Sequence, residues 1–213
     1  LLKINERKAQ DAFRKLGENK PHGIDFSSND YLGFAQSKTI FNQTHQFLLD
    51  KNLLINGATG SRLISGNFDL YTETEQYIAD FHQSESALIY NSGYDANLGF
   101  FSAVLQKGDV VLYDEYIHAS IRDGIRLSLA KAYRFKHNDC LDLAQKVVQY
   151  QENNSGNIYV VTESVFSMDG DIPDLVKMTQ ICNENQAYLI VDEAHALGVF
   201  GEKGEGLVQC LGF

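Results

Sequence analysis

Residues 187–191 form an apolar run, Ala-Tyr-Leu-Ile-Val, which ends at Asp192. A run without polar alternation is typical of a strand in a parallel sheet that helices cover on both faces. Ligands of open α/β sheets bind at the carboxyl ends of such strands. Asp192, with His195 three residues later, is therefore a candidate to meet a cationic ring nitrogen or a metal ion. The alternative is that Asp192 only caps the next turn.

Apolar runs alternate with amphipathic segments through most of the chain. We expect strands at 86–90, 110–113, 132–135, 158–162, 187–191 and 197–200. We expect helices at 1–16, 38–50, 70–83, 96–105, 141–151 and 173–184, and one that ends near 129. This alternation predicts an α/β fold with a mainly parallel sheet and helices on both faces. We expect an N-terminal helical arm and turn over residues 1–35, and one large α/β domain over residues 36–213.

Composition limits the classes of function. The 213 residues carry a net charge of -10, which argues against non-specific binding to nucleic acid. Residues 1–20 differ, because six Lys/Arg and three Asp/Glu give this segment a net charge of +3. A solvated basic face is the simpler interpretation of this segment. The other is a lid over a polyanionic substrate.

The cysteines and the apolar runs indicate the compartment. Cys140, Cys182 and Cys210 lie far apart without a CxxC pair, which suits neither a disulfide framework nor a zinc site. A reducing cytoplasm is therefore expected, with no bound metal. The sequence shows no signal peptide and no apolar run long enough to span a bilayer, so no membrane partner is expected.

Polar groups follow several predicted strands at their carboxyl ends. Parallel strands bring these ends to one edge of the sheet. Gly93 also precedes a predicted helix, whose free N–H groups favour an anion such as phosphate. Each residue has a simpler interpretation: His118 as a helix cap, Ser167 as a turn residue and Tyr94 as a core aromatic. The complete set of candidates at this edge is Ser92, Gly93, Tyr94, His118, Ser167, Asp192 and His195.

A series of motifs runs in order through nearly the whole chain. These motifs are 26–33 (FSSNDYLG), 60–66 (GSRLISG), 91–94 (NSGY), 118–120 (HAS), 162–171 (TESVFSMDGD) and 191–198 (VDEAHALG). The glycine-rich motif alone would be weak, and it is not a Walker A loop because the sequence contains no Gly-Lys dipeptide. With this ordered series, the chain resembles the α-oxoamine synthases, pyridoxal-phosphate (PLP) enzymes of fold type I.

The resemblance implies a role for each candidate. Asp192 would hold the pyridine nitrogen of PLP protonated, and His195 would bond the ring's phenolic oxygen, with Ser167 nearby. His118 would stack on the ring, so that His118, Asp192 and His195 form the catalytic set. The phosphate end would meet Ser92, Gly93 and Tyr94. Arg14 and Asn29 would contact the substrate.

The implied reaction is the decarboxylative condensation of an amino acid with an acyl-CoA. The resemblance also implies a homodimer with shared sites, in which the Gly60-Ser61 loop reaches the neighbouring subunit. The basic segment at residues 1–16 suits the phosphates of CoA.

The resemblance stops before two parts of the family pattern. The Schiff-base lysine lies downstream of the Asp192–His195 motif, and the small C-terminal domain follows it. Lys203, in a glycine-rich turn, is the only lysine of this chain after the motif. We therefore expect the 213-residue chain to be a fragment of a PLP enzyme's large domain that is inactive by itself.

Three other interpretations remain open. Residues 192–195 (DEAH) after an apolar strand also fit a DExH-type ATPase, although no phosphate loop is present. A non-catalytic partner subunit could keep the fold without the chemistry. Another α-oxoamine synthase would share these motifs with a different amino acid and acyl-CoA.

Overall fold

The computed structural model describes residues 2–13, 24–152 and 155–213. The chain divides into two compact units, Leu1–Tyr31 and Leu32–Phe213. The first unit contains helix α1 (Leu2–Ala9), which is shorter than the helix predicted over residues 1–16. Asp11 has a positive φ of 55°, a left-handed conformation that cannot continue a right-handed helix. Residues 14–16 of that prediction, Arg14 among them, lie outside the described residues.

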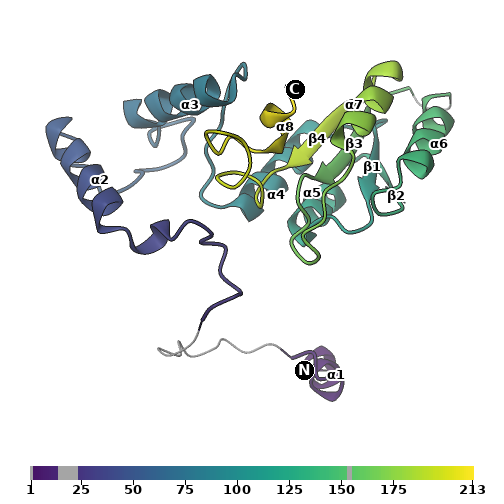
Figure 1. Cartoon of the computed structure of the whole chain (residues 1–213), viewed down its shortest axis with the longest axis horizontal. Coiled ribbons are helices and arrows are strands. Elements are labelled where there is room, and N and C mark those ends of the chain that lie inside the picture. The colour runs from purple at the N-terminus through teal and green to yellow at the C-terminus, as the bar shows by residue number, and fades with distance from the viewer. Residues whose placement is uncertain (1, 14–23, 153–154) are drawn as a thin grey trace. The chain divides into compact units, whose positions relative to one another are not determined.

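The second unit contains a four-stranded parallel sheet in the order β2-β1-β3-β4 (Figure 1). Its strands are β1 (Val110–Asp114), β2 (Lys131–Phe135), β3 (Ile158–Glu163) and β4 (Tyr188–Asp192). The predicted α/β fold class is confirmed. Strands β1, β3 and β4 each extend one residue further than predicted, so that each ends on a carboxylic acid.

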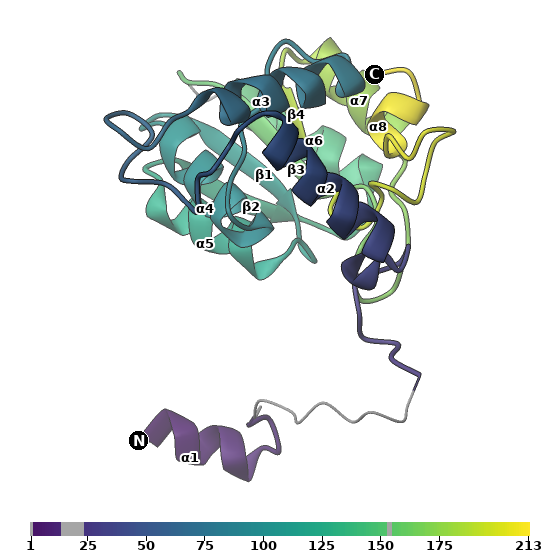
Figure 2. The same ribbon diagram turned by 90° about the vertical axis from the view of Figure 1, so that its left-hand side faces the viewer.

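Two hydrophobic clusters pack on opposite faces of the sheet. Val110, Leu112 and Val160 point toward α6 (Cys140–Gln151) and α7 (Leu175–Glu184). Val111 and Val161 point toward α4 (Gly93–Val104) and α5 (Ala119–Leu127). Figure 2 shows α4 and α5 on one side of the strands and α6 and α7 on the other. Burial on both faces explains why the strands lack polar alternation.

The remaining helices are α2 (Lys38–Asp50), α3 (Asp69–His82), α8 (Leu207–Cys210) and a 3-10 turn at Phe34–Gln36. Side-chain caps set several helix starts, because an acceptor beside the first turn satisfies a free backbone N–H. Asp174, for example, accepts a hydrogen bond from the Lys177 N–H at 2.9 Å. Helix α7 therefore begins after Asp174, two residues later than predicted. The other side-chain caps are Ser37, Ser92, His118 and Asp139.

Two predicted strands are wrong. Residues 86–90 have no regular secondary structure and pair with no strand among the described residues. A strand needs a neighbouring backbone, and here the Ile89 N–H donates to the Glu75 side chain instead, at 2.8 Å. Residues 197–200 lie in a turn, where the Val199 and Phe200 N–H groups both donate to the Ala196 carbonyl.

Candidate functional site

Three neighbouring strands end in carboxylic acids at the same edge of the sheet. Asp114 ends β1, Glu163 ends β3 and Asp192 ends β4. The register places Glu163 directly beside Asp192. Asp114 and Glu163 are 0% and 4% exposed, and Asp192 is half-buried. Three acids at one edge require separate sets of partners, because like charges repel in a poorly solvated site.

The Asp192 carboxylate is held at both oxygens. Its Oδ1 accepts from the Ala194 N–H at 2.9 Å, and its Oδ2 accepts from Asn97 Nδ2, also at 2.9 Å. Asn97 lies on α4 and donates a second hydrogen bond to Ser120 Oγ on α5, at 3.1 Å. Sequence reasoning missed Asn97, which shares no motif with Asp192 and meets it only through the packing of α4 on the sheet.

His118 joins the same network through Ser120. The Ser120 N–H donates to His118 Nδ1 at 3.2 Å, and Ser120 Oγ lies 2.7 Å from the same nitrogen. Since Ser120 Oγ accepts from Asn97, its own proton is free to donate to Nδ1. With two donors on Nδ1, the hydrogen-bond network assigns the neutral ring's proton to Nε2. The His118 side chain is exposed and caps α5, so the simpler interpretation as a helix cap also holds.

Glu163 contacts the same network through the backbone of His118. Its Oε1 accepts from the His118 backbone N–H at 2.5 Å. Burial raises the pKa of Glu163 to about 7, against the lowering effect of that hydrogen bond. The nearby charges of Asp192 and Asp114 act in the same direction as burial, and Arg122 acts in the opposite direction. The signal available in the sequence was that Glu163, like Asp192, closes an apolar run.

The start of α4 holds the next three candidates. Ser92 caps the helix, with its Oγ accepting from the Asp95 N–H at 3.0 Å. A Cβ at Gly93 would meet nothing within 4 Å, so the space beside this turn is open. Tyr94 is 45% exposed, which excludes a place in the core of the described unit. Its hydroxyl donates to Asp123 at 2.6 Å, and this hydrogen bond raises the pKa of Tyr94.

The other predicted residues do not gather in one cavity. Asp192 and Asn97 line a cavity of about 350 Å³ between α4, β3 and β4. Ser167 is exposed and lines a separate cavity of about 270 Å³ with Arg122 and Phe166. His195 is half-buried in the turn that follows β4. Asn29 is exposed in the first unit, and Arg14 lies outside the described residues.

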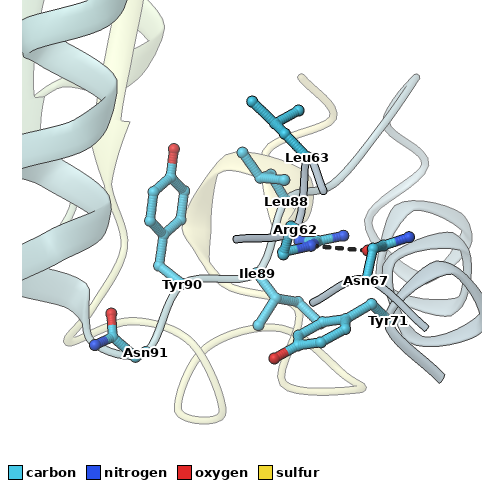
Figure 3. Close-up of a pocket in the computed structure, with 8 residues that line it drawn as sticks. All are labelled: Arg62, Leu63, Asn67, Tyr71, Leu88, Ile89, Tyr90 and Asn91. Carbon is cyan, nitrogen blue, oxygen red and sulfur yellow. Dashed lines mark hydrogen bonds between the residues drawn. The ribbon is translucent and has the colours of Figure 1, made fainter. Parts of the chain in front are cut away.

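A larger cavity, of about 690 Å³, lies beside the glycine-rich loop (Figure 3). Arg62 from this loop pairs with Glu75 of α3 through two hydrogen bonds of 2.6 and 2.8 Å. Arg62 also donates to Asn67 at 2.9 Å and lies over the Tyr71 ring. Hydrogen bonds from Arg62 and from the Ile89 N–H lower the pKa of Glu75 to about 2. The bidentate pair therefore fixes the glycine-rich loop to α3.

Comparison with known proteins identifies the family. Residues 21–210 match the protein family described as aminotransferase class I and II. The chain belongs to this family. Membership of the aminotransferase class I and II family agrees with the resemblance to α-oxoamine synthases and disfavours the DExH-type ATPase.

Relatives within the aminotransferase class I and II family carry α-oxoamine synthase names. The 8-amino-7-oxononanoate synthase of Lysinibacillus sphaericus is 42% identical over 187 residues, which cover 88% of this chain and 47% of that protein. The chain spans about half the length of the curated relatives it matches. The resemblance seen in the motifs is therefore confirmed.

Two solved structures show the same fold. Serine palmitoyltransferase from S. paucimobilis, solved with a bound PLP-myriocin aldimine, aligns with a TM-score of 0.79 at 34% identity. That match covers 87% of this chain and 47% of the other. The 8-amino-7-oxononanoate synthase of Francisella tularensis aligns with a TM-score of 0.66 at 33% identity, over 88% and 50% of the two chains. The fold is therefore that of the large domain of fold-type I PLP transferases. No helix among the described residues has the length and apolar character needed to cross a bilayer.

Proposed function

We propose that the protein containing this chain is a PLP-dependent C-acyltransferase that condenses an amino acid with an acyl-CoA and releases carbon dioxide. The observation that carries this proposal is the hydrogen-bonded set at the carboxyl edge of the sheet, in which Asn97 and Ser120 connect Asp192 to His118. The names of the relatives support the same activity.

The residues present fit PLP. Asp192 offers a carboxylate acceptor at the end of β4, which suits a protonated ring nitrogen. His118 offers an exposed imidazole on the same hydrogen-bond network. The start of α4 at Ser92 and Gly93 offers an open turn at a helix N-terminus, which suits a phosphate.

When bound, PLP would supply an electron sink for the bond that breaks at the α-carbon of the amino acid. The chain's own residues would hold and orient it. Asp192 would keep a proton on the ring nitrogen, and Asn97 would fix the carboxylate in place. His118 would pack against the ring face and offer its Nε2 proton to a carboxylate of the substrate. We propose a contact to the phenolic oxygen for His195 and Ser167, and a substrate contact for Asn29 and Arg14.

The names of the relatives suggest two substrate pairs. The product 8-amino-7-oxononanoate has an amino group and a methyl group beyond its ketone. Breaking the bond between carbons seven and eight gives alanine without its carboxylate and a seven-carbon dicarboxylic acyl group. Serine palmitoyltransferase names serine and a palmitoyl group instead. We propose the first pair, because the curated relative at 42% identity is an 8-amino-7-oxononanoate synthase.

A thiol-release assay on the intact protein tests this proposal. Alanine with heptanedioyl-CoA should release free CoA and carbon dioxide in equal amounts, and serine with palmitoyl-CoA should release far less. The Asp192→Asn variant should lose the activity, because its neutral amide cannot stabilise a ring-nitrogen cation. Equal release from the serine pair would overturn the substrate assignment. No release from either pair, with PLP bound, would favour the non-catalytic partner subunit.

We also propose a homodimer in the cytoplasm. Leu63 and Ile64 of the glycine-rich loop are 96% and 88% exposed, which suits cover by a second subunit. The wide spacing of Cys140, Cys182 and Cys210, without a CxxC pair, supports a reducing compartment.

A further inference from the structure

His137, which follows β2, lies in a cluster that the sequence did not indicate. Its side chain is only 18% exposed. Its Nδ1 lies 2.8 Å from Asp114 Oδ1, and its Nε2 lies 2.6 Å from Asp171 Oδ2. Both ring nitrogens therefore face carboxylate oxygens.

The partners of these carboxylates indicate which atoms carry protons. Asp114 accepts from the Asn138 N–H and the Tyr116 N–H, each at 2.9 Å. Asp171 Oδ2 accepts from Asn138 Nδ2 at 2.6 Å. Both acids thus act as hydrogen-bond acceptors in this cluster. Asn138 Nδ2 also lies 3.3 Å from Nε2, but the Asp171 oxygen at 2.6 Å is the nearer partner of this nitrogen. An imidazole that donates to two acceptors must carry a proton on each nitrogen, so this geometry favours the doubly protonated ring.

The surroundings of the ring agree with a positive charge. The Tyr116 ring is tilted by 32° to the His137 ring with centroids 4.4 Å apart, and the Phe166 ring is nearly perpendicular to it with centroids 4.5 Å apart. Burial lowers the pKa of His137, but the hydrogen bonds to Asp114 and Asp171 outweigh it and raise the pKa above its ordinary value. Glu115 adds a further carboxylate, which accepts from the His137 backbone N–H at 3.1 Å. The titratable groups that face the ring are therefore Asp114, Glu115, Tyr116 and Asp171.

The same contacts hold both ends of the loop that carries Ser167. The loop closes where the Phe166 N–H donates to the Asp171 carbonyl at 3.0 Å and the Gly170 N–H donates to the Phe166 carbonyl at 2.8 Å. His137 contacts Phe166 at one end of this closure and Asp171 at the other. Ser167 itself is exposed, and its side chain makes no hydrogen bond to another of the described residues.

We propose that His137 is a positioning residue, whose doubly protonated ring fastens the Ser167 loop to the carboxyl end of β1 and releases this loop when the ring loses a proton. The proposed charge of the His137 ring and the proposed ordering of the loop do not depend on the proposed enzyme activity. Only the consequence for Ser167 as a cofactor contact rests on the proposed function.

The pH dependence follows from the direction of the shift. A histidine whose folded pKa exceeds its unfolded value stabilises the fold fully below the unfolded pKa, which is ordinarily near 6.5. This stabilisation disappears as the pH rises through the folded pKa. The loop should therefore be ordered below pH 6.5 and loosen as the pH rises through the raised pKa of His137 in the folded protein.

NMR of the intact protein labelled with ¹⁵N-histidine tests the charge. Both ring nitrogens of His137 should give protonated signals at a pH where a histidine of the unfolded chain is already neutral. If His137 titrates like a histidine of the unfolded chain, the proposal fails. This measurement uses the unaltered protein, so its result does not depend on whether any variant folds.

Hydrogen exchange tests the loop. After correction for intrinsic rates, exchange at the Gly170 amide should rise at least about tenfold in His137→Gln, as expected for loss of charged hydrogen bonds. Asp171→Asn, which keeps a neutral acceptor, should show a smaller rise, and His45→Gln should show none. The unaltered protein should also exchange faster above the His137 titration, and His137→Gln should lose this pH dependence. Unchanged exchange in His137→Gln would overturn the proposal.

Activity distinguishes the two proposals. If the intact protein shows no acyltransferase activity but His137 stays doubly protonated, only the proposed function fails. If the protein is active, His137→Gln should weaken PLP binding below pH 6.5 about as much as deprotonation of His137 weakens it in the unaltered protein. Equal PLP affinity in His137→Gln would remove the link between this histidine and Ser167.

Discussion

Glu163 is a buried acid between two other acids, and its ionisation works against folding. Its pKa of about 7 lies above the ordinary value of 4.5, so the folded state binds one more proton between these pH values. The unfolding free energy should therefore fall as the pH rises from 4.5 to 7, by up to about 3 kcal/mol.

The Glu163→Gln variant tests this effect. The glutamine keeps an oxygen that can accept from the His118 N–H, but it carries no charge. We expect the variant to be more stable than the unaltered protein at pH 8 and to lose the decline between pH 4.5 and 7. Chemical denaturation at several pH values measures this. A Glu202→Gln variant, altered at an exposed position of the turn that follows strand β4, serves as the control. A decline that persists in Glu163→Gln would contradict the pKa shift.

At the scale of elements, the close packing of α4 against α5 brings Asn97 to Ser120. Gly124 of α5 makes this approach possible. A Cβ at this position would lie 2.8 Å from the Asn97 carbonyl oxygen and 2.9 Å from the Phe101 Cβ. Both are closer than carbon atoms tolerate, so a larger residue would push the two helices apart.

Gly124→Ala should therefore destabilise the protein by about 1–3 kcal/mol, the usual cost of overpacking, even though alanine is the better helix former. PLP affinity should fall as well, because the displaced α4 carries Asn97. Denaturation and PLP fluorescence titration measure these two effects. Arg126→Ala, on an exposed position of the same helix, should change neither. Unaltered stability in Gly124→Ala would show that the helices can separate at little cost.

The elements also show where sequence reasoning works. Strands β1, β3 and β4 were predicted because burial on both faces removes polar residues from them. Residues 86–90 are also mostly apolar, but they pair with no strand in the described part of the chain. The composition of a segment does not record whether a partner strand lies beside it. The helix caps at Ser92 and Asp174 are local, which is why the helix starts were predicted to within three residues.

At the scale of the whole molecule, a ligand that binds only the folded state raises its stability. PLP at a hundredfold excess over its dissociation constant should raise the unfolding free energy of the intact protein by about 2.7 kcal/mol. ATP, the ligand of the DExH-type alternative, should have no effect. Thermal denaturation with each ligand separates these interpretations. Asp192→Asn should abolish the stabilisation by PLP. Asp80→Asn, on an exposed face of α3, should preserve it. Stabilisation by ATP alone would refute the assignment to a PLP enzyme.

The sequence by itself determined the parallel α/β fold, the family and the carboxylate at the end of β4, because these follow from local burial patterns and ordered motifs. Only the tertiary structure decided that Asn97 and Ser120 connect Asp192 to His118, and that His137 lies between Asp114 and Asp171. Apart from Ser120 and His118, which are two positions apart, those partners are separated by 23 to 95 positions along the chain. Hydrogen bonds of this kind form only when the donor and the acceptor lie within a few tenths of an ångström of their preferred separation. The packing of the helices on the sheet sets that separation, and no local sequence pattern encodes it.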